Sequence, residues 1–256
     1  MDLQPAHYPS LVNQIVFITG GGSGIGAELT RAFHLQGAQV AFIDIDQTAS
    51  LALIEKLKAE TGRAPWFQVC DIRDIAALRK VIEDVGEQLG PISVLVNNAA
   101  SDDRHDWRTV EPEYWDDRVN INIRPAFFAI QAVASQMIKA GKGSIINFGS
   151  ISIQLAAGEM PAYVTAKSAT HGLTRAMARS LGEHGIRVNT IVPGCIITER
   201  QLDKWISPED EINIQKHQCL KFRLVAEHVA PAVLFLASDA SQAITATELP
   251  VNGGWG

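Results

Sequence analysis

The sequence predicts an α/β fold in which a doubly wound parallel sheet carries helices on both faces. Short apolar segments rich in β-branched residues alternate with longer segments of helical periodicity along the whole chain, and such alternation is typical of parallel sheets. The apolar segments are mostly continuous, as expected for strands that are covered on both faces. The 256 residues contain no linker or internal repeat. We therefore expect a single Rossmann-type domain over residues 1–256.

Strands are expected where Val, Ile and Phe cluster in short runs, and helices where the pattern is longer and amphipathic. Gly37, Gly62, Gly90 and Gly185 follow helical segments, and glycine readily takes the left-handed conformation that ends a helix. In chain order the expected elements are strand 15–19, helix 24–36, strand 39–44, helix 47–60, strand 65–70, helix 74–89, strand 92–96, helix 113–140, strand 143–149, helix 161–183, strand 186–192, helix 226–238 and strand 249–251.

Residues 195–225 interrupt this rhythm, because they mix apolar residues such as Trp205 and Phe222 with charges. An insertion of this length between a strand and a helix is often a lid over a substrate. A small helical extension that supports subunit contacts is the alternative. We favour the lid.

Composition excludes several classes of function. The formal net charge of −6 argues against nonspecific nucleic-acid binding, and no apolar run approaches the roughly 20 residues that cross a bilayer. Residues 1–12 lack the basic start and apolar stretch of a secretion signal. Cys70, Cys195 and Cys219 have no metal-binding spacing, so we expect reduced thiols in the cytoplasm and no metal site.

A glycine-rich turn follows the first strand directly, in the run Thr19-Gly20-Gly21-Gly22-Ser23-Gly24-Ile25-Gly26. Glycines between a strand and a helix let backbone amides approach a pyrophosphate, and the helix N-terminus favours its negative charge. Elsewhere such a cluster would be only a loop, but this position predicts a dinucleotide site.

Asp44 ends the second strand about 20 residues beyond the glycines. A carboxylate there can accept from the hydroxyls of an adenosine ribose and would repel a 2′-phosphate. Neither Ile45 nor Asp46 supplies a compensating cation, and Arg31 belongs to the preceding helix. The sequence therefore predicts NAD rather than NADP, unless Asp44 is a solvated strand end.

Tyr163 and Lys167 are four residues apart, so the phenol and the ammonium share one face of a helix. A cation beside a phenol favours phenolate and lowers its pKa, which would let the tyrosine act as a base near neutral pH. Ser150 lies thirteen residues before the tyrosine. A Tyr–Lys pair alone is a weak signal, so its weight depends on the rest of the chain.

Taken together, these features resemble the short-chain dehydrogenase/reductase family over nearly the whole length. Ala100 departs from the family pattern, which usually has glycine there. The residues that carry the resemblance are Thr19-Gly20-x-x-x-Gly24-x-Gly26, Asp71, Asn97-Asn98-Ala99-Ala100, Asn122, Ser150, Tyr163, Lys167, Pro193-Gly194 and Thr198.

The resemblance implies a role for each of these positions. Tyr163 would be the general acid/base, Lys167 would lower its pKa and bond the nicotinamide ribose, and Ser150 would donate to the substrate oxygen. Asn122 would interrupt a helix and hold a water that joins Lys167 to solvent. The cofactor contacts would be Gly20, Ser23, Gly24, Ile25 and Gly26 at the pyrophosphate, Asp44, Ile45, Asp71 and Ile72 at the adenosine, Asn98, Ala99 and Ala100 below the ribose, and Pro193, Gly194, Ile196 and Thr198 at the nicotinamide.

The loops beside the expected site of hydride transfer are unusually polar, which suits a polyol or sugar better than a steroid or acyl chain. Ordinary solvation of these loops is the alternative. A narrower resemblance, to bacterial aldose 1-dehydrogenases, is carried by Asp102-Asp103-Arg104-His105, Ser150-Ile151-Ser152, Arg200-Gln201 and Lys204-Trp205. It implies oxidation of a pentose such as D-xylose or L-arabinose at C1, and the sugar-contact candidates are Ser150, Ser152, Gln154, Tyr163, Asp103, Arg104, Cys195 and Arg200.

Two other functions remain open. The first is an NADPH-dependent reductase of a ketone or 3-oxoacyl thioester, which Asp44 opposes. The second is a noncatalytic dinucleotide-binding regulator, which the presence of Ser150, Tyr163 and Lys167 opposes. The family resemblance also implies a homotetramer, and the small residues between Pro161 and Gly172 would permit close helix approach, although packing within the chain would use them equally well.

Overall fold

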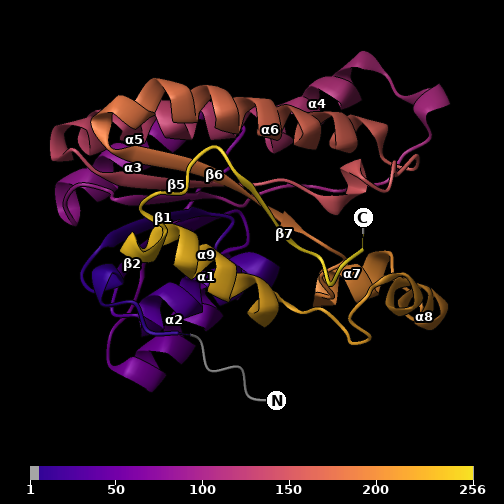
Figure 1. The fold of residues 1–256 in the computed structure, drawn as a ribbon, viewed down its shortest axis with the longest axis horizontal. Helices are drawn as coiled ribbons and strands as arrows, with labels where there is room; N and C mark the ends of the chain where they lie inside the picture. The colour runs from indigo at the N-terminus through magenta and orange to yellow at the C-terminus, as the bar shows by residue number, and fades with distance from the viewer. Residues whose placement is uncertain (1–5, 256) are drawn as a thin grey trace.

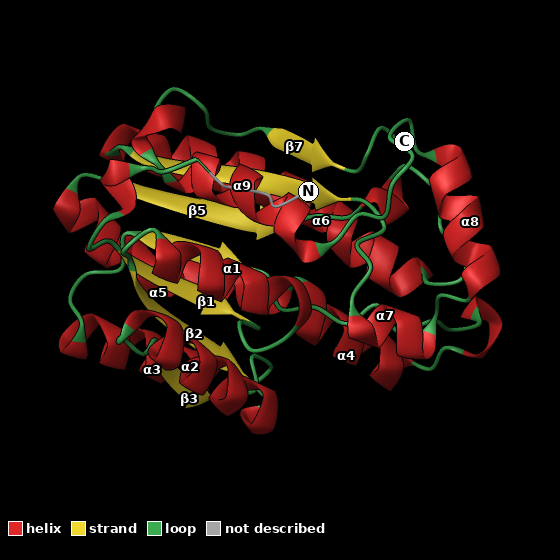
Figure 2. Ribbon diagram, turned by 90° about the horizontal axis from the view of Figure 1, so that it is seen from below, coloured by secondary structure: helices red, strands yellow, loops and turns green. Residues whose placement is uncertain are grey.

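The computed structural model describes residues 6–255, and in this range it contains one seven-stranded parallel sheet with helices on both faces (Figures 1 and 2). The predicted fold class is therefore confirmed. The strand order is β3-β2-β1-β4-β5-β6-β7. The strands are β1 (Ile15–Thr19), β2 (Gln39–Asp44), β3 (Trp66–Val69), β4 (Val94–Asn97), β5 (Gly143–Phe148), β6 (Ile186–Pro193) and β7 (Glu248–Val251).

The order of the strands reverses between β1 and β4, which are neighbours in the sheet although two strands separate them in the chain. Thr19 at the end of β1 pairs with Asn97 at the end of β4, and Asn97 pairs with Asn147 of β5. Loops leave such a switch point in opposite directions, and ligands of open α/β sheets bind in the crevice between them. The functional site is therefore expected at this edge.

The helices form two layers (Figure 1). Helices α1, α2 and α9 cover one face of the sheet, while α3, α5 and α6 cover the other. Their bounds are α1 (Gly24–Leu35), α2 (Gln47–Thr61), α3 (Ile75–Gln88), α4 (Pro112–Asn122), α5 (Arg124–Ala140), α6 (Pro161–Leu181), α7 (Glu199–Lys204), α8 (Pro208–His217) and α9 (Ala226–Ala237), with short 3₁₀ turns at Pro9–Leu11, Trp107–Thr109, Ile151–Ile153, Gly182–His184 and Asp239–Ser241.

Each layer buries its own apolar cluster against the sheet. Phe33 of α1 and Val233 of α9 belong to one cluster, and Val81 of α3 and Val133 of α5 belong to the other. All five residues of β1 are buried, which explains why its sequence shows no polar alternation. Among the helices of residues 6–255, none combines the length and apolar character that a membrane span requires.

The single helix expected over residues 113–140 is two helices, α4 and α5. Ile123 leaves the helical conformation (φ −137°), and Pro125 follows two residues later. Proline has no N–H to donate to the carbonyl four residues back, so the hydrogen-bond ladder breaks there. The break falls directly after Asn122, in agreement with the predicted interruption of a helix.

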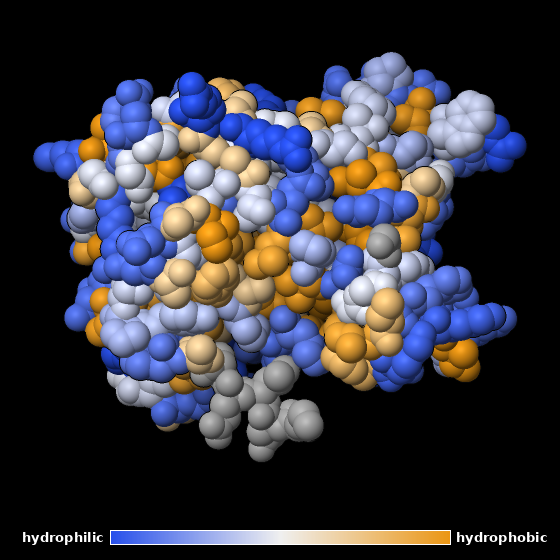
Figure 3. Space-filling model, viewed as in Figure 1, coloured by the Kyte–Doolittle hydropathy of each residue, from blue (hydrophilic) through white to orange (hydrophobic). Residues whose placement is uncertain are grey.

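Residues 195–225 fold into α7 and α8, which lie beyond the carboxyl ends of the strands together with α4 (Figure 2). The molecule is hollowed at this end between two protruding parts, and apolar side chains line the inner surface seen in Figure 3. The insertion thus borders the edge of the sheet where the site is expected.

Candidate active site

The glycine-rich turn joins β1 to α1 in a conformation that needs glycine. Gly20 and Gly24 have positive φ values of 66° and 53°. At Gly26 an added Cβ would lie 1.7 Å from the carbonyl oxygen of Gly20, so helix and turn touch through backbone alone. Ser23 is exposed at the N-terminus of α1. The turn therefore presents accessible backbone at a helix N-terminus, as pyrophosphate binding requires.

Asp44 is held against this turn at the end of β2. Its carboxylate accepts hydrogen bonds from the backbone N–H of Gly22 (2.9 Å) and of Asp46 (3.0 Å). The carboxylate is 9% exposed, whereas the neighbouring Ile45 is 69% exposed. A fixed carboxylate beside a bare apolar side chain fits the ribose and the adenine of a dinucleotide, respectively.

Asn98 fastens the loop after β4 to the glycine turn. Its side chain donates to the carbonyls of Thr19 (3.1 Å) and Gly20 (2.9 Å), and the Thr19 hydroxyl accepts from the N–H groups of Asn98 and Ala99 (3.1 Å each). The side chain of Asn98 is thus occupied by the protein, and it shapes the floor of the site together with Ala99. Ala100 follows, half-buried.

Asp71 has a partner that sequence reasoning did not anticipate. Arg73 donates to both of its carboxylate oxygens (2.6–3.0 Å) and also pairs with Asp117 on α4 (2.9 Å). The Arg73 guanidinium holds the pKa of Asp71 below its usual range. Contact of Asp71 with an adenine would have to share the carboxylate with Arg73, whereas Ile72 is simply buried beside it.

Ser150, Tyr163 and Lys167 converge at the carboxyl ends of β4, β5 and β6. Ser150 follows β5, and its hydroxyl accepts from the N–H of Ser152 (3.1 Å). Tyr163 lies in the first turn of α6; burial raises its pKa, and the hydroxyl of Ser150 acts against this rise. The ammonium of Lys167 is 5.7 Å from the centre of the Tyr163 ring and donates to the Phe148 carbonyl (2.8 Å). The three side chains therefore lie close together.

Burial dominates the electrostatic balance at Tyr163. Burial raises the pKa of Tyr163 well above its usual value, and the charge of Asp102 raises it further, while Ser150 and Arg200 lower it. The ammonium of Lys167 lies beside the Tyr163 ring and donates to the Phe148 carbonyl. Burial also lowers the pKa of Lys167, to about 8. The lowering of the Tyr163 pKa by Lys167 stays a prediction.

Asn122 uses its side chain to brace the loop that follows β4. It accepts from the N–H of Ser101 (2.9 Å) and donates to the carbonyls of Ser101 and Arg118 (3.0 Å each). A cavity of about 20 Å³ lies between Asn122, Lys167, Asn147 and Thr170, which is enough space for one water. Since the amide of Asn122 is already satisfied, a water there would bond to other groups of the cavity.

The nicotinamide-end candidates follow β6. Gly194 donates to the Val251 carbonyl (2.9 Å), and an added Cβ there would lie 2.7 Å from the backbone of Asn252. Ile196 is buried, and the hydroxyl of Thr198 caps α7. An added Cβ at Gly24 would be 3.5 Å from the Thr198 methyl, so this segment borders the glycine turn. The structure thus brings Pro193–Thr198 to the same crevice.

The sugar-contact candidates are not equivalent. Ser152 is 6% exposed, and within residues 6–255 its hydroxyl has no hydrogen-bond partner, whereas Gln154 is exposed. Cys195 is half-buried, and burial raises the pKa of its thiol. Arg104 lies over the ring of Trp205 (5.0 Å). Of this set, Ser152 has the environment expected of a group that meets a ligand hydroxyl.

Comparison with known proteins assigns the family. Residues 20–256 match the family model described as enoyl-(acyl carrier protein) reductase. A probable galactose dehydrogenase of Rhizobium meliloti (strain 1021) is 48% identical over 99% of both chains. The D-xylose 1-dehydrogenase of Caulobacter vibrioides (strain NA1000 / CB15N) is 47% identical over 99% of this chain and all of the other.

A crystal structure from Sinorhizobium meliloti 1021, described as a short-chain alcohol dehydrogenase, superposes with a TM-score of 0.91 at 28% identity and covers 96% of this chain and 98% of that one. The chain belongs to the short-chain dehydrogenase/reductase family. The resemblance inferred from the sequence is confirmed.

Sequence reasoning missed Asp102 in this dehydrogenase and chose Asp103 instead. The charge of Asp102 acts on Tyr163, Lys167 and Cys195. Asp103 is tied to Ser101, Arg118 and Arg200 (2.7–3.1 Å). Neighbouring residues of an extended chain point to opposite sides, but the sequence alone does not say which of the two faces the site.

His105 is a second residue that sequence reasoning did not assign. Its Nε2 accepts from the N–H of Ala162 (3.2 Å) at the start of α6, one residue before Tyr163. Tyr114 lies 3.0 Å from Nδ1 of the same ring. Because Nε2 accepts from a backbone N–H, the proton of the neutral imidazole ring is on Nδ1. This nitrogen faces the Asp103 carbonyl (3.2 Å). His105 thus caps the helix that carries the candidate base of this dehydrogenase.

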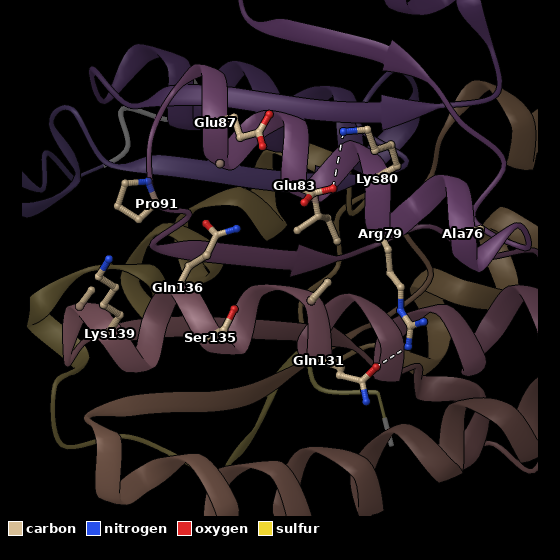
Figure 4. A pocket seen from close by; sticks show the side chains of 14 residues that line it. Ala76, Arg79, Lys80, Glu83, Glu87, Pro91, Gln131, Ser135, Gln136 and Lys139 are labelled. Carbon is tan, nitrogen blue, oxygen red and sulfur yellow. Dashed lines mark hydrogen bonds and ion pairs between the residues drawn. The ribbon is translucent and has the colours of Figure 1, made fainter.

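Two further kinds of site, a metal site and a second pocket, have to be compared with this crevice. No group of metal-binding side chains occurs in the described part of the chain. A surface groove of about 930 Å³ between α3 and α5 is lined by mixed charges, including Arg79, Lys80 and Glu83 (Figure 4). None of the dinucleotide or catalytic candidates lines it. The chemistry of this dehydrogenase is therefore expected at the switch point of the sheet.

Proposed function

We propose that this protein oxidises a cyclic aldose at C1 with NAD and releases an aldonolactone. The observation that carries the proposal is the 47–48% identity, over almost the entire chain, to proteins named D-xylose 1-dehydrogenase and galactose dehydrogenase. The grouping of Ser150, Tyr163 and Lys167 beside the glycine turn supports it, because alcohol oxidation needs a base and a hydride acceptor at one carbon.

Tyr163 would take the proton of the C1 hydroxyl, and Ser150 would donate to the same oxygen and stabilise its developing negative charge. When bound, an oxidised nicotinamide supplies the hydride acceptor and a positive ring charge that favours phenolate. Such a charge is needed here, since burial raises the pKa of Tyr163 and the opposing effects of Ser150 and Arg200 do not cancel it. Lys167 lies one helical turn after Tyr163. It would bind the ribose through the ammonium N–H groups that do not bond to the Phe148 carbonyl.

NAD rather than NADP is proposed from the surroundings of Asp44. The carboxylate accepts only two backbone N–H bonds, so lone pairs remain for ribose hydroxyls. A 2′-phosphate would bring a second negative charge next to it. Arg31 of α1 is paired with Glu28 (3.4 Å).

The test is the rate of nicotinamide reduction, measured by absorbance with a panel of aldoses and with both dinucleotides. Turnover of D-xylose, L-arabinose or D-galactose with NAD is the expected result. Turnover restricted to ketones or 3-oxoacyl thioesters with NADPH would instead establish the alternative, an NADPH-dependent reductase of those substrates. Dinucleotide binding without turnover of any of these substrates would establish a regulator.

We further propose a homotetramer in the cytoplasm. The three thiols are free in the structure, which suits a reducing compartment. An added Cβ at Gly172 of α6 would meet nothing within 4 Å, so a second copy could approach this helix closely. Sedimentation equilibrium tests the assembly: four times 27.8 kDa is expected, and a monomer mass at micromolar concentration would exclude the tetramer.

A further inference from the structure

Asp102 is held in place from one side by helix α7. Gln201 donates to one of its carboxylate oxygens (2.6 Å), and Arg200 lies 3.3 Å from the other. The side chain of Asp102 is 23% exposed, so a ligand can still reach it. An ionised carboxylate can accept about four hydrogen bonds. Acceptor sites therefore remain on Asp102 after these two contacts.

Asp103 is the natural comparison, because its carboxylate has more protein partners than that of Asp102. One oxygen accepts from Ser101 (2.7 Å) and Arg118 (3.0 Å), while the other faces Arg200 (3.1 Å) and Lys204 (3.9 Å). These contacts join the loop after β4 to α4 and α7. Asp103 thus holds the loop in place, and Asp102 is the carboxylate of the pair that has more acceptor sites free for a ligand.

The loop that carries Asp102 is attached on both sides of this residue: the N–H of Ser101 donates to Asn122 (2.9 Å), and His105 accepts from the N–H of Ala162 (3.2 Å), one residue before Tyr163. Asp102 therefore lies near the start of α6. Its charge acts on the phenol of Tyr163, the ammonium of Lys167 and the thiol of Cys195, which come from α6 and from the segment after β6. An independent observation comes from Ser152, which follows the catalytic candidate Ser150 by two residues. Its hydroxyl is 6% exposed and has no partner in the described residues. Buried hydroxyls are normally hydrogen-bonded, so a polar ligand would supply the hydrogen-bond partner that the Ser152 hydroxyl lacks.

We propose that Asp102 recognises the sugar by accepting a hydrogen bond from the hydroxyl next to the reacting carbon. This inference rests on the proposed aldose oxidation and adds a specificity-determining residue to it. Arg200 and Gln201 hold the carboxylate in position, and the Arg200 charge offsets the negative charge that Asp102 brings to Tyr163. A simple alcohol without the neighbouring hydroxyl would leave the carboxylate without this partner, and sites built in this way discriminate strongly.

The experiment compares an aldose with its 2-deoxy analogue, in the wild type and in Asp102→Asn. D-galactose and 2-deoxy-D-galactose are the first pair, and D-xylose with 2-deoxy-D-xylose is the second. In the wild type the 2-deoxy sugar should lose roughly 10- to 100-fold in kcat/KM, the range for a hydrogen bond to a charged group. In Asp102→Asn the parent sugar should lose a similar factor, mostly through KM, and the penalty for the 2-deoxy sugar should largely disappear. The KM for NAD should stay within twofold.

Asp106→Asn is the matched control. Asp106 is four residues away in the same loop and pairs with the exposed Arg108 (2.8 Å), so its removal should leave both sugars unchanged. A full 2-deoxy penalty that persists in a folded Asp102→Asn protein would overturn the inference and indicate that Asp102 only supports α7. If the variant does not fold, equal kcat/KM for parent and 2-deoxy sugars in the wild type would overturn it equally. Absence of any aldose oxidation by the wild type would instead overturn the proposed function, and this inference with it.

Discussion

At the residue scale, chemistry depends on which partners a side chain already has. Asp102 and Asp103 are adjacent and identical, but the Asp103 carboxylate accepts hydrogen bonds from three side chains, whereas that of Asp102 accepts one from Gln201 and pairs with Arg200, which leaves acceptor sites free. Asp71 and Asn98 similarly have protein partners of their own. Residue type and spacing predict the region of the site, but the distribution of hydrogen bonds decides which groups remain available to a ligand.

Replacing Tyr163 with phenylalanine tests the proposed base. Tyr163→Phe keeps the ring that packs beside Lys167 and removes the oxygen that would take the proton. We expect kcat for the best aldose to fall by about 10²- to 10⁴-fold, the usual contribution of a general base, with NAD affinity within a few fold of the wild type. Stopped-flow reduction and a fluorescence titration of NAD measure the two quantities. A nearly normal kcat would remove Tyr163 from the mechanism.

Asp44→Ala tests the choice of dinucleotide. The variant loses acceptors for the ribose hydroxyls and the negative charge that opposes a 2′-phosphate. We expect kcat/KM for NAD to fall about tenfold or more and the value for NADP to rise, while the KM of the aldose changes little. Initial rates with both dinucleotides decide the matter. An unchanged ratio of the two specificity constants would show that Asp44 does not select the cofactor.

At the scale of elements, two helix ends organise the site. The end of α4 places Asn122 against Ser101, because Pro125 prevents one continuous helix. The start of α6 has no cap from its own N-cap residue, Met160, and is capped instead by His105. A side chain 57 residues away thus satisfies an N–H group that would otherwise lack a partner.

His105→Ala tests whether this cap positions Tyr163. Loss of an N-terminal cap costs about 1 kcal/mol, so the free energy of unfolding should fall by about that amount. The first turn of α6 also loses its fixed position, so kcat should fall several-fold with little change in the KM for NAD. His184→Ala, an exposed histidine beyond the far end of α6, is the control. If both variants unfold alike in urea and turn over alike, His105 has no such role.

At the scale of the whole molecule, the sheet brings together segments that are far apart in the chain. The glycine turn, Asp44, the loop after β4 and the segment after β6 meet because all seven strands of the described residues end at one edge. The same packing buries Lys167, which is 3% exposed and bonded to Phe148. Burial of a charged group costs stability, and here it lowers the pKa of Lys167 to about 8 from an ordinary value of 10.5.

This shift predicts how stability depends on pH. Between about pH 8 and 10.5 the unfolded chain holds a proton on Lys167 that the folded protein has released, so this residue makes the free energy of unfolding rise with pH. The slope is at most about 1.4 kcal/mol per pH unit. Lys167→Met removes it, so the stability difference between variant and wild type should change steadily from pH 8 to 10 in urea titrations. Parallel curves for the two proteins over that range would contradict the prediction.

The sequence by itself determined the fold class, the order of the elements, the dinucleotide turn and the positions of Ser150, Tyr163 and Lys167. These features follow from local patterns: periodicity, glycine where the backbone needs it, and residues that come directly after strands. The tertiary structure alone decided the direction of the pKa shift of Tyr163, the partners of Asp71 and Asp103, the cap that His105 supplies and the availability of Asp102. Each of these depends on burial or on contacts between segments that are distant in the chain, and electrostatic energies vary with both in ways that spacing along a sequence does not encode.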